Sequence, residues 1–504
     1  MTEKEKKIPK EAGEISRREF LKDAGFVVAG AAIGAGITYP LASGGKEPWL
    51  PDKWDYEADV VVVGTGFAGL SAAIEVQDAG CKTIVLEKTA TPESGSILCL
   101  GAVTAGGSSL QKEVGIDFSP EDYNDRIMGM SGNKNDPELV QIYAENSGKA
   151  IDWLVSLGVE FNTPSGSSHQ LAPGYYEGPA VAIPKLISVA REQGAEVLFE
   201  TKAEQLVLDR ANNDMVIGVE AVDKGGKTIY FKAKRAVVLA TGGHGASKEI
   251  LERLCPGWEE SIPVCSLVAT GDGLIMAQAV GARVSRDMAY NTGGGAHPKE
   301  RILITGAMEM KPILVNKDGK RFVDESIDVY TVITPALVKE KDATAYSIFD
   351  SEMMETFKKT ITIKIEEYIK RGMVIEANTI EDLASKLGLV ASSLRNTVDT
   401  YNEALEKGQQ PSPERAKGAS KIAVPPFYGV ELVPGIICCR GGLDVNAKAE
   451  VFNVNGNKIP RLYAAGEVGG NLFGQGYIGG SFTTQAFVFG RIAGQNAANL
   501  EPWD

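Results

Sequence analysis

Histidine is scarce in this chain of 504 residues, which contains only His169, His244 and His297. This scarcity argues against a metal site built on histidine, and we expect no metal. The six cysteines include no C-x-x-C pair and no C-x-x-C-H, which argues against a zinc ribbon and a c-type haem. So few cysteines in so long a chain do not make a disulfide framework. We expect the adjacent Cys438 and Cys439 to be small buried residues, with a strained redox pair as the alternative.

Positive charge is also in short supply. Lys and Arg number 52 against 66 Asp and Glu, which gives a formal net charge of −14. Because no basic stripe is offered to phosphates, nucleic acid is not an expected partner. Glycine, in contrast, is abundant at 57 residues, which suits close approaches of backbone to a ligand. The length predicts two domains rather than a single core.

The most informative stretch runs from Val60 to Gly69 and reads VVVGTGFAGL. An apolar, β-branched run ends at Gly64, and a G-x-G-x-x-G pattern, with Gly66 at its centre, opens a helical pattern. Glu87 closes the next apolar run, TIVLEK. Such a turn aims backbone N–H groups and a helix N-terminus at a pyrophosphate, and an acid at the tip of the next strand can hold a ribose hydroxyl. The stretch therefore predicts dinucleotide binding.

The N-terminal segment has the pattern of an export signal. Residues 16–22 read SRREFLK and are followed by the weakly hydrophobic stretch AGFVVAGAAIGAGITYPLA. This predicts a twin-arginine signal peptide over residues 1–45 and a location in the periplasm or on the outer face of the cytoplasmic membrane. A membrane anchor is an alternative, whereas an amphipathic helix fits poorly because the stretch has no polar face. The twin-arginine route carries folded proteins, which agrees with a tightly held cofactor.

The rest of the chain divides into three parts. Residues 58–88 form a predicted strand–helix–strand unit, and 237–243 read VVLATGG, a strand ending in small residues that let the backbone pass close to a cofactor. Composition becomes more mixed and charged from about 291 to 420, which suggests an inserted domain. We predict the first part of a nucleotide-binding domain over 56–290, an insertion over 291–420 and the second part over 421–504.

Seven motifs carry a family resemblance. They are GTGFAGL with Glu87, ATGG at 240–243, ATGDG at 269–273, AHP at 296–298, NKDGKRFVDE at 316–325, LYAAGE at 462–467 and GGSFTTQAFVFGRIAG at 479–494. In this order they resemble the flavoprotein family of fumarate reductases and succinate dehydrogenases, which includes 3-ketosteroid dehydrogenases. The resemblance covers residues 56–498. It implies an α/β fold: a Rossmann-like FAD-binding domain of the two-dinucleotide-fold type with an inserted α+β capping domain.

The resemblance also implies which residues hold FAD. In the family the glycine turn and Glu87 hold the pyrophosphate and adenosine ribose, and the helix starting near Gly480 points its N-terminus at the flavin. Members that bond the flavin covalently use a His in the loop after residue 88, where this chain has none before His169, so we expect non-covalent FAD. The implied cofactor residues are Gly64, Gly66, Phe67, Ala68, Gly69, Glu87, Lys88, Ser94, Gly95, Ser96, Ala240, Thr241, Gly242, Gly243, Asp272, Glu467, Gly480, Ser481 and Phe482.

The chain departs from fumarate reductases at the substrate site. The family's proton-donating Arg lies eight residues after the Arg of its R-F-x-x-E segment, and here that position is Val329. A second Arg, which clamps a carboxylate, is replaced by Tyr477, and a His is replaced by the cysteines before Arg440. The AHP histidine, His297, is kept. These losses of charge argue against a dicarboxylate substrate.

The replacements resemble 3-ketosteroid dehydrogenases, in which one Tyr moves a proton at carbon while another polarises the ketone. Tyr477 and Tyr330 match those tyrosines imperfectly, and Tyr175 and Tyr176 could add a wall to the pocket. For each tyrosine the alternative is simple packing with a hydrogen-bonded hydroxyl. A tyrosine in this role needs a lowered pKa, and we expect one. His297 is expected near the substrate.

These observations predict an exported FAD-dependent oxidoreductase that adds or removes hydrogen across a C–C bond next to a carbonyl. The expected substrate is an enone, 3-ketosteroid-like or otherwise bulky and apolar. One alternative is a fumarate-reductase-like reductase of an unsaturated carboxylate that uses Arg440 and His297. Another is an electron-transfer flavoprotein subunit without a small substrate. The catalytic candidates are Tyr477, Tyr330, His297 and Arg440. Because the chain has no haem motif and no second complete G-x-G-x-x-G, we expect a separate electron carrier, a cytochrome or a quinone-linked protein.

Overall fold

The computed structural model describes residues 50–504 apart from 175–176, 290, 304–311 and 361–364. The predicted export signal and the pair Tyr175 and Tyr176 lie outside the described residues. Contacts divide the chain into residues 1–46 and 47–504, and the second unit is described below. Within the described ranges, no helix combines the length and the apolar character needed to cross a bilayer.

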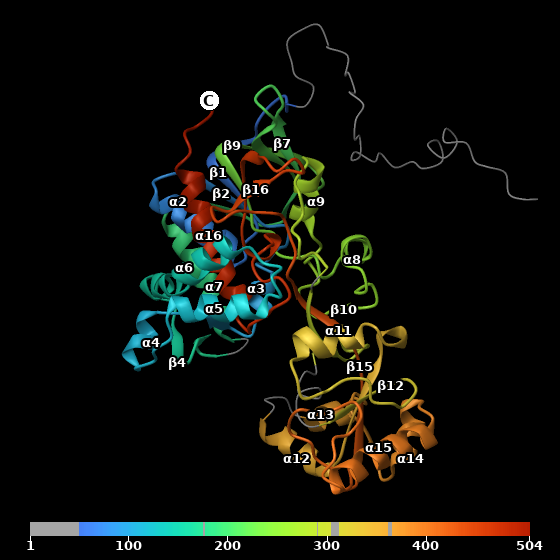
Figure 1. Ribbon diagram of the computed structural model, residues 1–504. Helices are drawn as coiled ribbons and strands as arrows, with labels where there is room; N and C mark the ends of the chain where they lie inside the picture. Colours follow the sequence, from blue (N-terminus) through green and yellow to red (C-terminus); the bar gives the residue numbers. More distant parts are fainter. Residues whose placement is uncertain (1–49, 175–176, 290, 304–311, 361–364) are drawn as a thin grey trace, which may run out of the picture. The chain divides into compact units, whose positions relative to one another are not determined.

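An eight-stranded sheet forms the larger part of this unit (Figure 1). Its central strands are parallel and run in the order β17, β9, β1, β2, β6, while β16 pairs antiparallel with β17, and β7 and β8 form an antiparallel flap on β9. The strands are β1 (Tyr56–Val63), β2 (Thr83–Leu86), β6 (Glu196–Leu198), β7 (Thr201–Asp209), β8 (Met215–Asp223), β9 (Thr228–Leu239), β16 (Glu450–Phe452) and β17 (Lys458–Ala464).

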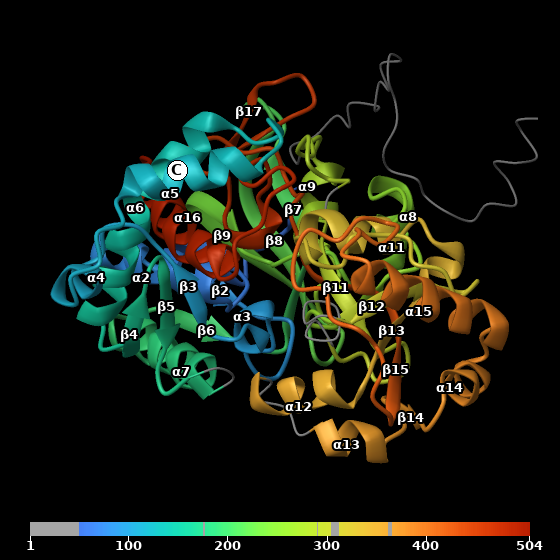
Figure 2. The same ribbon diagram turned by 60° about the horizontal axis from the view of Figure 1, so that its bottom comes forward.

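Helices cover this sheet, and Figures 1 and 2 both show α2, α6, α7 and α16 gathered beside it. They belong to the set α2 (Phe67–Asp78), α3 (Gly95–Leu98), α4 (Ser109–Glu113), α5 (Pro120–Met130), α6 (Pro137–Ser156), α7 (Glu177–Glu192), α8 (Lys248–Leu254), α9 (Asp272–Ala279), the short turn η3 (Gly466–Val468) and α16 (Ser481–Ala498). A three-stranded sheet lies among them, with β3 (Ala102–Thr104), β5 (Ser168–Leu171) and β4 (Phe161–Ser165) in that order.

Burial explains the apolar second half of β1. Its last four residues, 60–63, are buried on both faces, as expected for a parallel strand covered by helices. Small residues let α2 and α16 approach closely, since a Cβ on Gly490 would lie 2.4 Å from the carbonyl oxygen of Ala68. The rings of Phe67 and Phe487 fill the same interface with centroids 4.5 Å apart. This packing fixes both helices, whose N-termini lie at the site described below.

A second sheet of six strands has its own hydrophobic core. Strand β15 lies at its centre and pairs with β10, β11, β13 and β14, while β12 extends the sheet from β13. The elements are β10 (Ile262–Pro263), β11 (Asn291–Ala296), β12 (Ile313–Asn316), β13 (Ala345–Phe349), β14 (Ile375–Ala377), β15 (Phe427–Cys439), η1 (Val329–Ile333), α11 (Thr334–Leu337), η2 (Lys341–Ala343), α12 (Ser351–Thr360), α13 (Ile365–Lys370), α14 (Ile380–Leu387) and α15 (Ala391–Glu406).

The sequence accounts for the helices of this part. Thr379 caps α14 by accepting a hydrogen bond from the Asp382 backbone N–H, and Gly388 ends the helix in a left-handed conformation. In α15, Leu394, Val398 and Tyr401 are buried at helical spacing, and the opposite face is polar. Figure 2 shows α14 and α15 beside β13 and β15.

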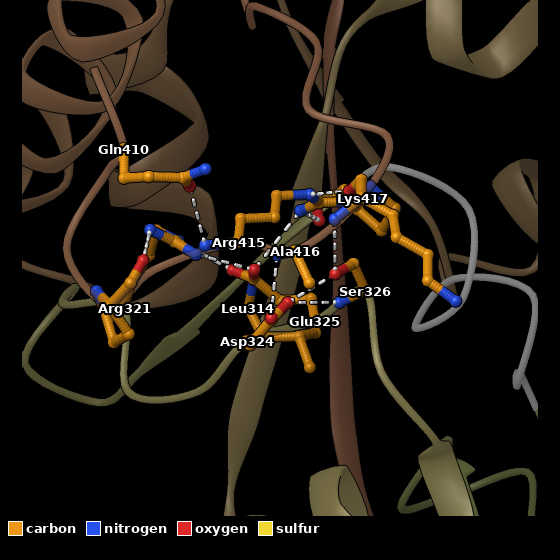
Figure 3. Close-up of polar contacts among 11 residues, drawn as sticks. Leu314, Arg321, Asp324, Glu325, Ser326, Gln410, Arg415, Ala416 and Lys417 are labelled. Atoms are coloured by element: carbon orange, nitrogen blue, oxygen red, sulfur yellow. Dashed lines mark hydrogen bonds and ion pairs between the residues drawn. The ribbon is translucent and has the colours of Figure 1, made fainter.

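An ion cluster is buried in the same part (Figure 3). The Glu325 carboxylate accepts bonds from Arg321 Nε and Nη2, both at 2.7 Å, from Arg415 Nη1 at 3.2 Å and from the Leu314 backbone N–H at 3.0 Å. Arg415 Nη1 also donates to the carbonyl of Pro312 at 2.8 Å. The cluster thus ties β12 to the segment between β12 and η1 and to the loop after α15.

The second sheet extends beyond the boundaries predicted for the insertion. Strand β15 follows residue 420 yet pairs with β13 and β14, and β10 precedes residue 291 yet pairs with β15. The change in composition marks where polar helices begin and end. It does not mark which sheet an apolar strand joins, because that depends on pairing partners distant in sequence.

Candidate active site

The glycine turn packs against the end of β9. Gly64 has a φ of +113°, and a Cβ there would lie 2.3 Å from the carbonyl oxygen of Ala240. A Cβ on Gly69 would lie 1.9 Å from the carbonyl oxygen of Gly64, so α2 could not seat on the turn with any larger residue. The turn therefore places the backbone N–H groups at the start of α2 beside the carboxyl ends of β1 and β9.

A cavity of about 560 Å³ begins at this turn. Of the nineteen predicted cofactor residues, all but Gly69 and Ser481 line it. Gly69 serves the close packing just described, and Ser481 is buried within the first turn of α16. The lining residues are Gly64, Gly66, Phe67, Ala68, Glu87, Lys88, Ser94, Gly95, Ser96, Ala240, Thr241, Gly242, Gly243, Asp272, Glu467, Gly480 and Phe482.

Two threonines orient Glu87 at the cavity wall. Its Oε2 accepts from the backbone N–H of Thr65 at 3.2 Å and from the Thr65 hydroxyl at 2.5 Å. Its Oε1 accepts from the Thr89 N–H at 3.0 Å and the Thr89 hydroxyl at 2.8 Å. The carboxylate is thereby fixed at the tip of β2, as a ribose-binding acid requires. Thr65 was not singled out from the sequence, although it sits inside the glycine motif.

Lys88 and Asp272 are joined to each other on the cavity wall. Lys88 Nζ lies 2.6 Å from Asp272 Oδ2 and donates to the Val268 carbonyl at 2.6 Å and to Thr270 Oγ1 at 2.9 Å. The pair tethers the tip of β2 to the N-terminus of α9. Because Lys88 is engaged in these bonds, its role at the cofactor site is to stabilise the cavity wall.

The residues present fit the FAD that the resemblance implies. Ser94 Oγ and Thr241 Oγ1 are buried at the cavity and have no hydrogen-bond partner in the described part of the chain. Such buried hydroxyls require a partner, and a phosphate or ribityl oxygen would supply one. A Cβ on Gly243 would lie 2.2 Å from Glu467 Oε1, so no larger residue fits at this position of the cavity wall. FAD would be held by the glycine turn, Glu87, the loop 94–96 and the loop 240–243.

Glu467 and α16 complete the cofactor side of the cavity. Glu467 Oε1 accepts from the Cys439 backbone N–H at 2.7 Å. Withdrawal from water raises the pKa of Glu467 to about 7. Helix α16 begins at Gly480, whose φ is +87°, and Gly480, Phe482 and Thr483 line the cavity. The positive end of this helix dipole therefore faces the cavity.

Two tyrosines also line the cavity. Tyr330, on η1 of the second sheet's part, and Tyr477, just before α16, line it together. Their rings lie edge to face with centroids 4.9 Å apart, and Tyr477 also packs on Phe482 at 5.8 Å. The structure thus brings together two catalytic candidates that are far apart in the sequence.

The expected pKa of the catalytic tyrosine is wrong in direction. Burial, with smaller contributions from Cys438 and Tyr330, raises the pKa of Tyr477 well above its ordinary value. A second tyrosine and a dry pocket both disfavour the phenolate when no cation stands beside it. Tyr477 is therefore a neutral phenol that can donate a proton or a hydrogen bond.

His297 and Arg440 lie elsewhere. Neither is among the residues that line the cavity. His297 Nδ1 accepts from the Glu300 backbone N–H at 3.3 Å, which makes it a loop-capping residue. Arg440 is buried and donates to the backbone carbonyls of Asn291 and Gly476. Their roles in catalysis stay predictions.

The cysteines behave as buried thiols. Cys438 and Cys439 are both buried, as expected, and neither forms a disulfide within the described residues. Cys438 and Cys265 line the cavity, and burial raises the pKa of Cys265 to about 12. Within the ranges that the structure describes, no group of three or more His, Cys, Asp or Glu side chains is placed to hold a metal ion.

Sequence reasoning missed several cavity residues beside the tyrosines. Leu98 and Leu100 line the wall while these residues stay 49% and 46% exposed, so they form an apolar rim. Arg301, Ile302 and Leu303 line it from the loop after β11. These residues carry no motif, and only the folded chain brings them to the cavity.

Comparisons agree with this geometry. The family profile described as "FAD binding domain" matches residues 59–483. A probable fumarate reductase, Ifc3, of Shewanella frigidimarina is 30% identical over 485 residues, covering 91% of this chain and 80% of that protein. Urocanate reductase of Eggerthella lenta is 33% identical over 474 residues, covering 90% of this chain and 76% of that protein. The crystal structure of 3-ketosteroid-Δ4-(5α)-dehydrogenase from Rhodococcus jostii with 4-androstene-3,17-dione matches with a TM-score of 0.72 at 27% identity, covering 89% and 98% of the two chains.

The chain therefore belongs to the FAD-binding flavoprotein family that contains the fumarate reductases. It is an FAD-dependent oxidoreductase that acts on CH–CH groups. The expected fold class and cofactor are confirmed.

Proposed function

We propose that this protein reduces a C=C bond conjugated to a carbonyl in a bulky, largely apolar molecule, with Tyr477 as the proton donor. The observation that carries the proposal is the edge-to-face pair of Tyr330 and Tyr477 in the cavity that also contains the cofactor loops. The apolar rim of Leu98 and Leu100 supports a bulky substrate rather than a small dicarboxylate.

We infer the reductive direction from the reductases among the relatives together with the neutral state of Tyr477. FAD, when bound, supplies a hydride in its reduced form and accepts one in its oxidised form. Saturating the double bond requires a proton at the neighbouring carbon, and a neutral phenol beside that carbon can give it. Dehydrogenation would instead require a phenolate, which the burial of Tyr477 disfavours. The site therefore supports a reductase. Tyr330, packed against Tyr477, orients it and can donate a hydrogen bond to the carbonyl.

The test is flavin reoxidation under anaerobic conditions. The reduced holoprotein is mixed with 4-androstene-3,17-dione, cinnamate or fumarate, and flavin absorbance is followed. We expect turnover with at least one bulky substrate and none with fumarate. Tyr477→Phe should lower the rate on the best substrate by about 10²- to 10⁴-fold, the usual contribution of a general acid.

Tyr428→Phe is the matched control. Tyr428 is a buried tyrosine of β15 that stacks on Phe349 outside the cavity, so its hydroxyl should have no effect on the rate. A Tyr477→Phe enzyme as fast as the Tyr428→Phe enzyme would remove Tyr477 from the mechanism. Fumarate turnover as fast as that of a bulky substrate would refute the substrate class.

Electron supply and location belong to the same proposal. We propose that a cytochrome or a quinone-linked protein reduces the flavin, because the sequence holds no haem motif and no second complete dinucleotide motif. We also propose export by the twin-arginine route, on the basis of Arg17 and Arg18. Replacing both by Lys and fractionating the cells tests this, since loss of export is the expected result.

A further inference from the structure

Two buried phenols form a hydrogen-bonded chain that ends at the first turn of α16. Tyr123 on α5 and Tyr143 on α6 are fully buried, and their hydroxyl oxygens lie 2.9 Å apart. The Tyr143 hydroxyl also donates to the backbone carbonyl of Ser481 at 2.8 Å. Helix α6 lies beside α16 in both views (Figures 1 and 2). Neither tyrosine lines the cavity or belongs to one of the seven motifs, so the site described above leaves this pair unexplained.

The hydrogen bonds of this pair can run in only one direction. A phenol carries one hydrogen, and a carbonyl oxygen can only accept. Tyr143 therefore gives its hydrogen to Ser481, and Tyr123 gives its own hydrogen to Tyr143. Burial raises the pKa of Tyr123 to about 12 and raises that of Tyr143 well above its ordinary value, so both phenols stay neutral. Because the chain ends on a carbonyl, it polarises a peptide bond and cannot pass a proton onward.

Two threonines fix the same turn from the protein interior. The Thr104 hydroxyl, on β3, donates to the Gly479 carbonyl at 3.3 Å. The Thr484 hydroxyl, on α16, accepts from the Thr104 N–H at 3.0 Å and donates to the Thr104 carbonyl at 2.7 Å. Both threonines are buried. The residues at the start of α16 are therefore held by side-chain hydroxyls of β3, α6 and α16 itself.

The peptide bond that accepts from Tyr143 joins Ser481 to Phe482, which lines the cavity. Because a peptide unit is planar and trans, its N–H points away from its carbonyl, toward the N-terminal end of the helix. A bond accepted by the carbonyl makes this N–H a stronger donor, since hydrogen bonds in a chain polarise one another. The Ser481 hydroxyl is also buried in this turn, without a hydrogen-bond partner in the described part of the chain. A buried hydroxyl of this kind requires a partner, which points to a ligand at the turn.

We propose that Tyr143, supported by Tyr123, is a positioning residue that raises the reduction potential of the bound flavin. It fixes and polarises the first turn of α16, whose positive end faces the cavity. Reduction adds electron density to the flavin ring, so stronger donors at this turn favour the reduced form. The inference requires FAD in the cavity, but it depends neither on the substrate nor on the role of Tyr477. It can therefore fail while the proposed function holds, and the reverse is equally true.

The experiment measures the midpoint potential of the flavin by anaerobic reductive titration of the holoenzyme against a reference dye, without substrate. The wild type is compared with Tyr143→Phe, Tyr123→Phe and the matched control Tyr463→Phe. Tyr463 is a buried tyrosine on β17 of the same core, and it lies outside the cavity lining. Tyr143→Phe keeps the ring, whose centroid lies 5.9 Å from that of Phe473 and 6.4 Å from that of Phe489, and removes only the hydroxyl.

Tyr143→Phe should weaken the preference for reduced over oxidised flavin by roughly three- to tenfold, the range for one lost hydrogen bond. At about 30 mV per tenfold change, the potential becomes about 15–30 mV more negative. Tyr123→Phe leaves the bond to Ser481 in place and should shift the potential in the same direction by a smaller amount. Tyr463→Phe should not change it.

A potential of Tyr143→Phe equal to that of Tyr463→Phe, or more positive than that of the wild type, would overturn the proposal. The melting temperature of each holoenzyme is measured as well, because a merely structural hydroxyl would lower it and leave the potential unchanged. If Tyr143→Phe does not retain FAD, Tyr123→Phe decides the matter. A potential of Tyr123→Phe that matches the control would then refute the role of the pair.

Discussion

Glu325→Gln should strongly destabilise the second core. Residue Glu325 is 1% exposed, and its carboxylate accepts four bonds, three of them from the guanidinium groups of Arg321 and Arg415. Glutamine keeps one acceptor oxygen but places its NH₂ group, a donor, against the donor N–H groups of the arginines. Two buried cations would then share no counter-charge (Figure 3).

The magnitude follows from this geometry. Removing one partner of a buried ion pair costs about 3–5 kcal/mol, because the remaining charge stays desolvated. Hydrogen exchange at the backbone amides of β12 and β13 reports opening of this core. At about 1.4 kcal/mol per tenfold change, exchange there should speed up by roughly two to nearly four orders of magnitude. Amides of β1, in the other core, serve as the internal reference.

Glu381→Gln provides a matched control. Glu381 accepts two bonds from Arg395 at 2.7 Å each, the same two-pronged geometry, but both side chains are exposed. Exchange in the second core should hardly respond, because exposed pairs are screened by water. If Glu325→Gln were as mild as Glu381→Gln, burial of the charges would not be what makes the cluster stabilising, and the reasoning would fail.

Two further predictions concern the cofactor loops. Gly243→Ala should lower FAD affinity at least about tenfold, because the new Cβ would lie 2.2 Å from Glu467 Oε1 and push that side chain into the cavity. Titration followed by flavin fluorescence measures this affinity. The control Gly129→Ala, whose Cβ meets nothing within 4 Å, should bind FAD normally. Between pH 4.5 and about 7 the FAD-free folded protein keeps a proton on Glu467 that the unfolded chain releases, so this residue makes stability fall as pH rises. Glu467→Gln should remove that decline, and parallel melting temperatures of the two proteins across the window would contradict the assignment.

The cofactor side of the site was accessible from the sequence for a physical reason. Glycines 64 and 69 are required by contacts within a few residues or with one neighbouring strand, so the restriction appears as a local motif. The alternation of strands and helices around it gave the fold class in the same way. Which sheet β15 joins depends on distant partners, and neither composition nor motif reports that pairing.

The substrate side was only partly accessible. Tyr330 and Tyr477 were found because each lies close to a family motif. Motif position does not say what a side chain contacts, and His297 and Arg440 form hydrogen bonds with backbone groups. Arg301 lies in no motif and reaches the wall through a turn that its neighbours stabilise. The pKa of Tyr477 likewise depends on burial, which the sequence does not state.

Strand β15 also limits how the protein can be re-engineered. Its first half pairs with β13 and β14, and its last residues reach the cofactor side, where Cys438 lines the cavity and Cys439 bonds Glu467. If residues up to 420 were exchanged for those of a relative, β13 and β14 would come from one protein and β15 from the other. The hydrogen bonds between these strands would then join two different sequences. A chimera that carries β15 whole, through residue 439, would import two residues of the site along with the cap. Substrate preference and flavin environment would therefore be inherited together.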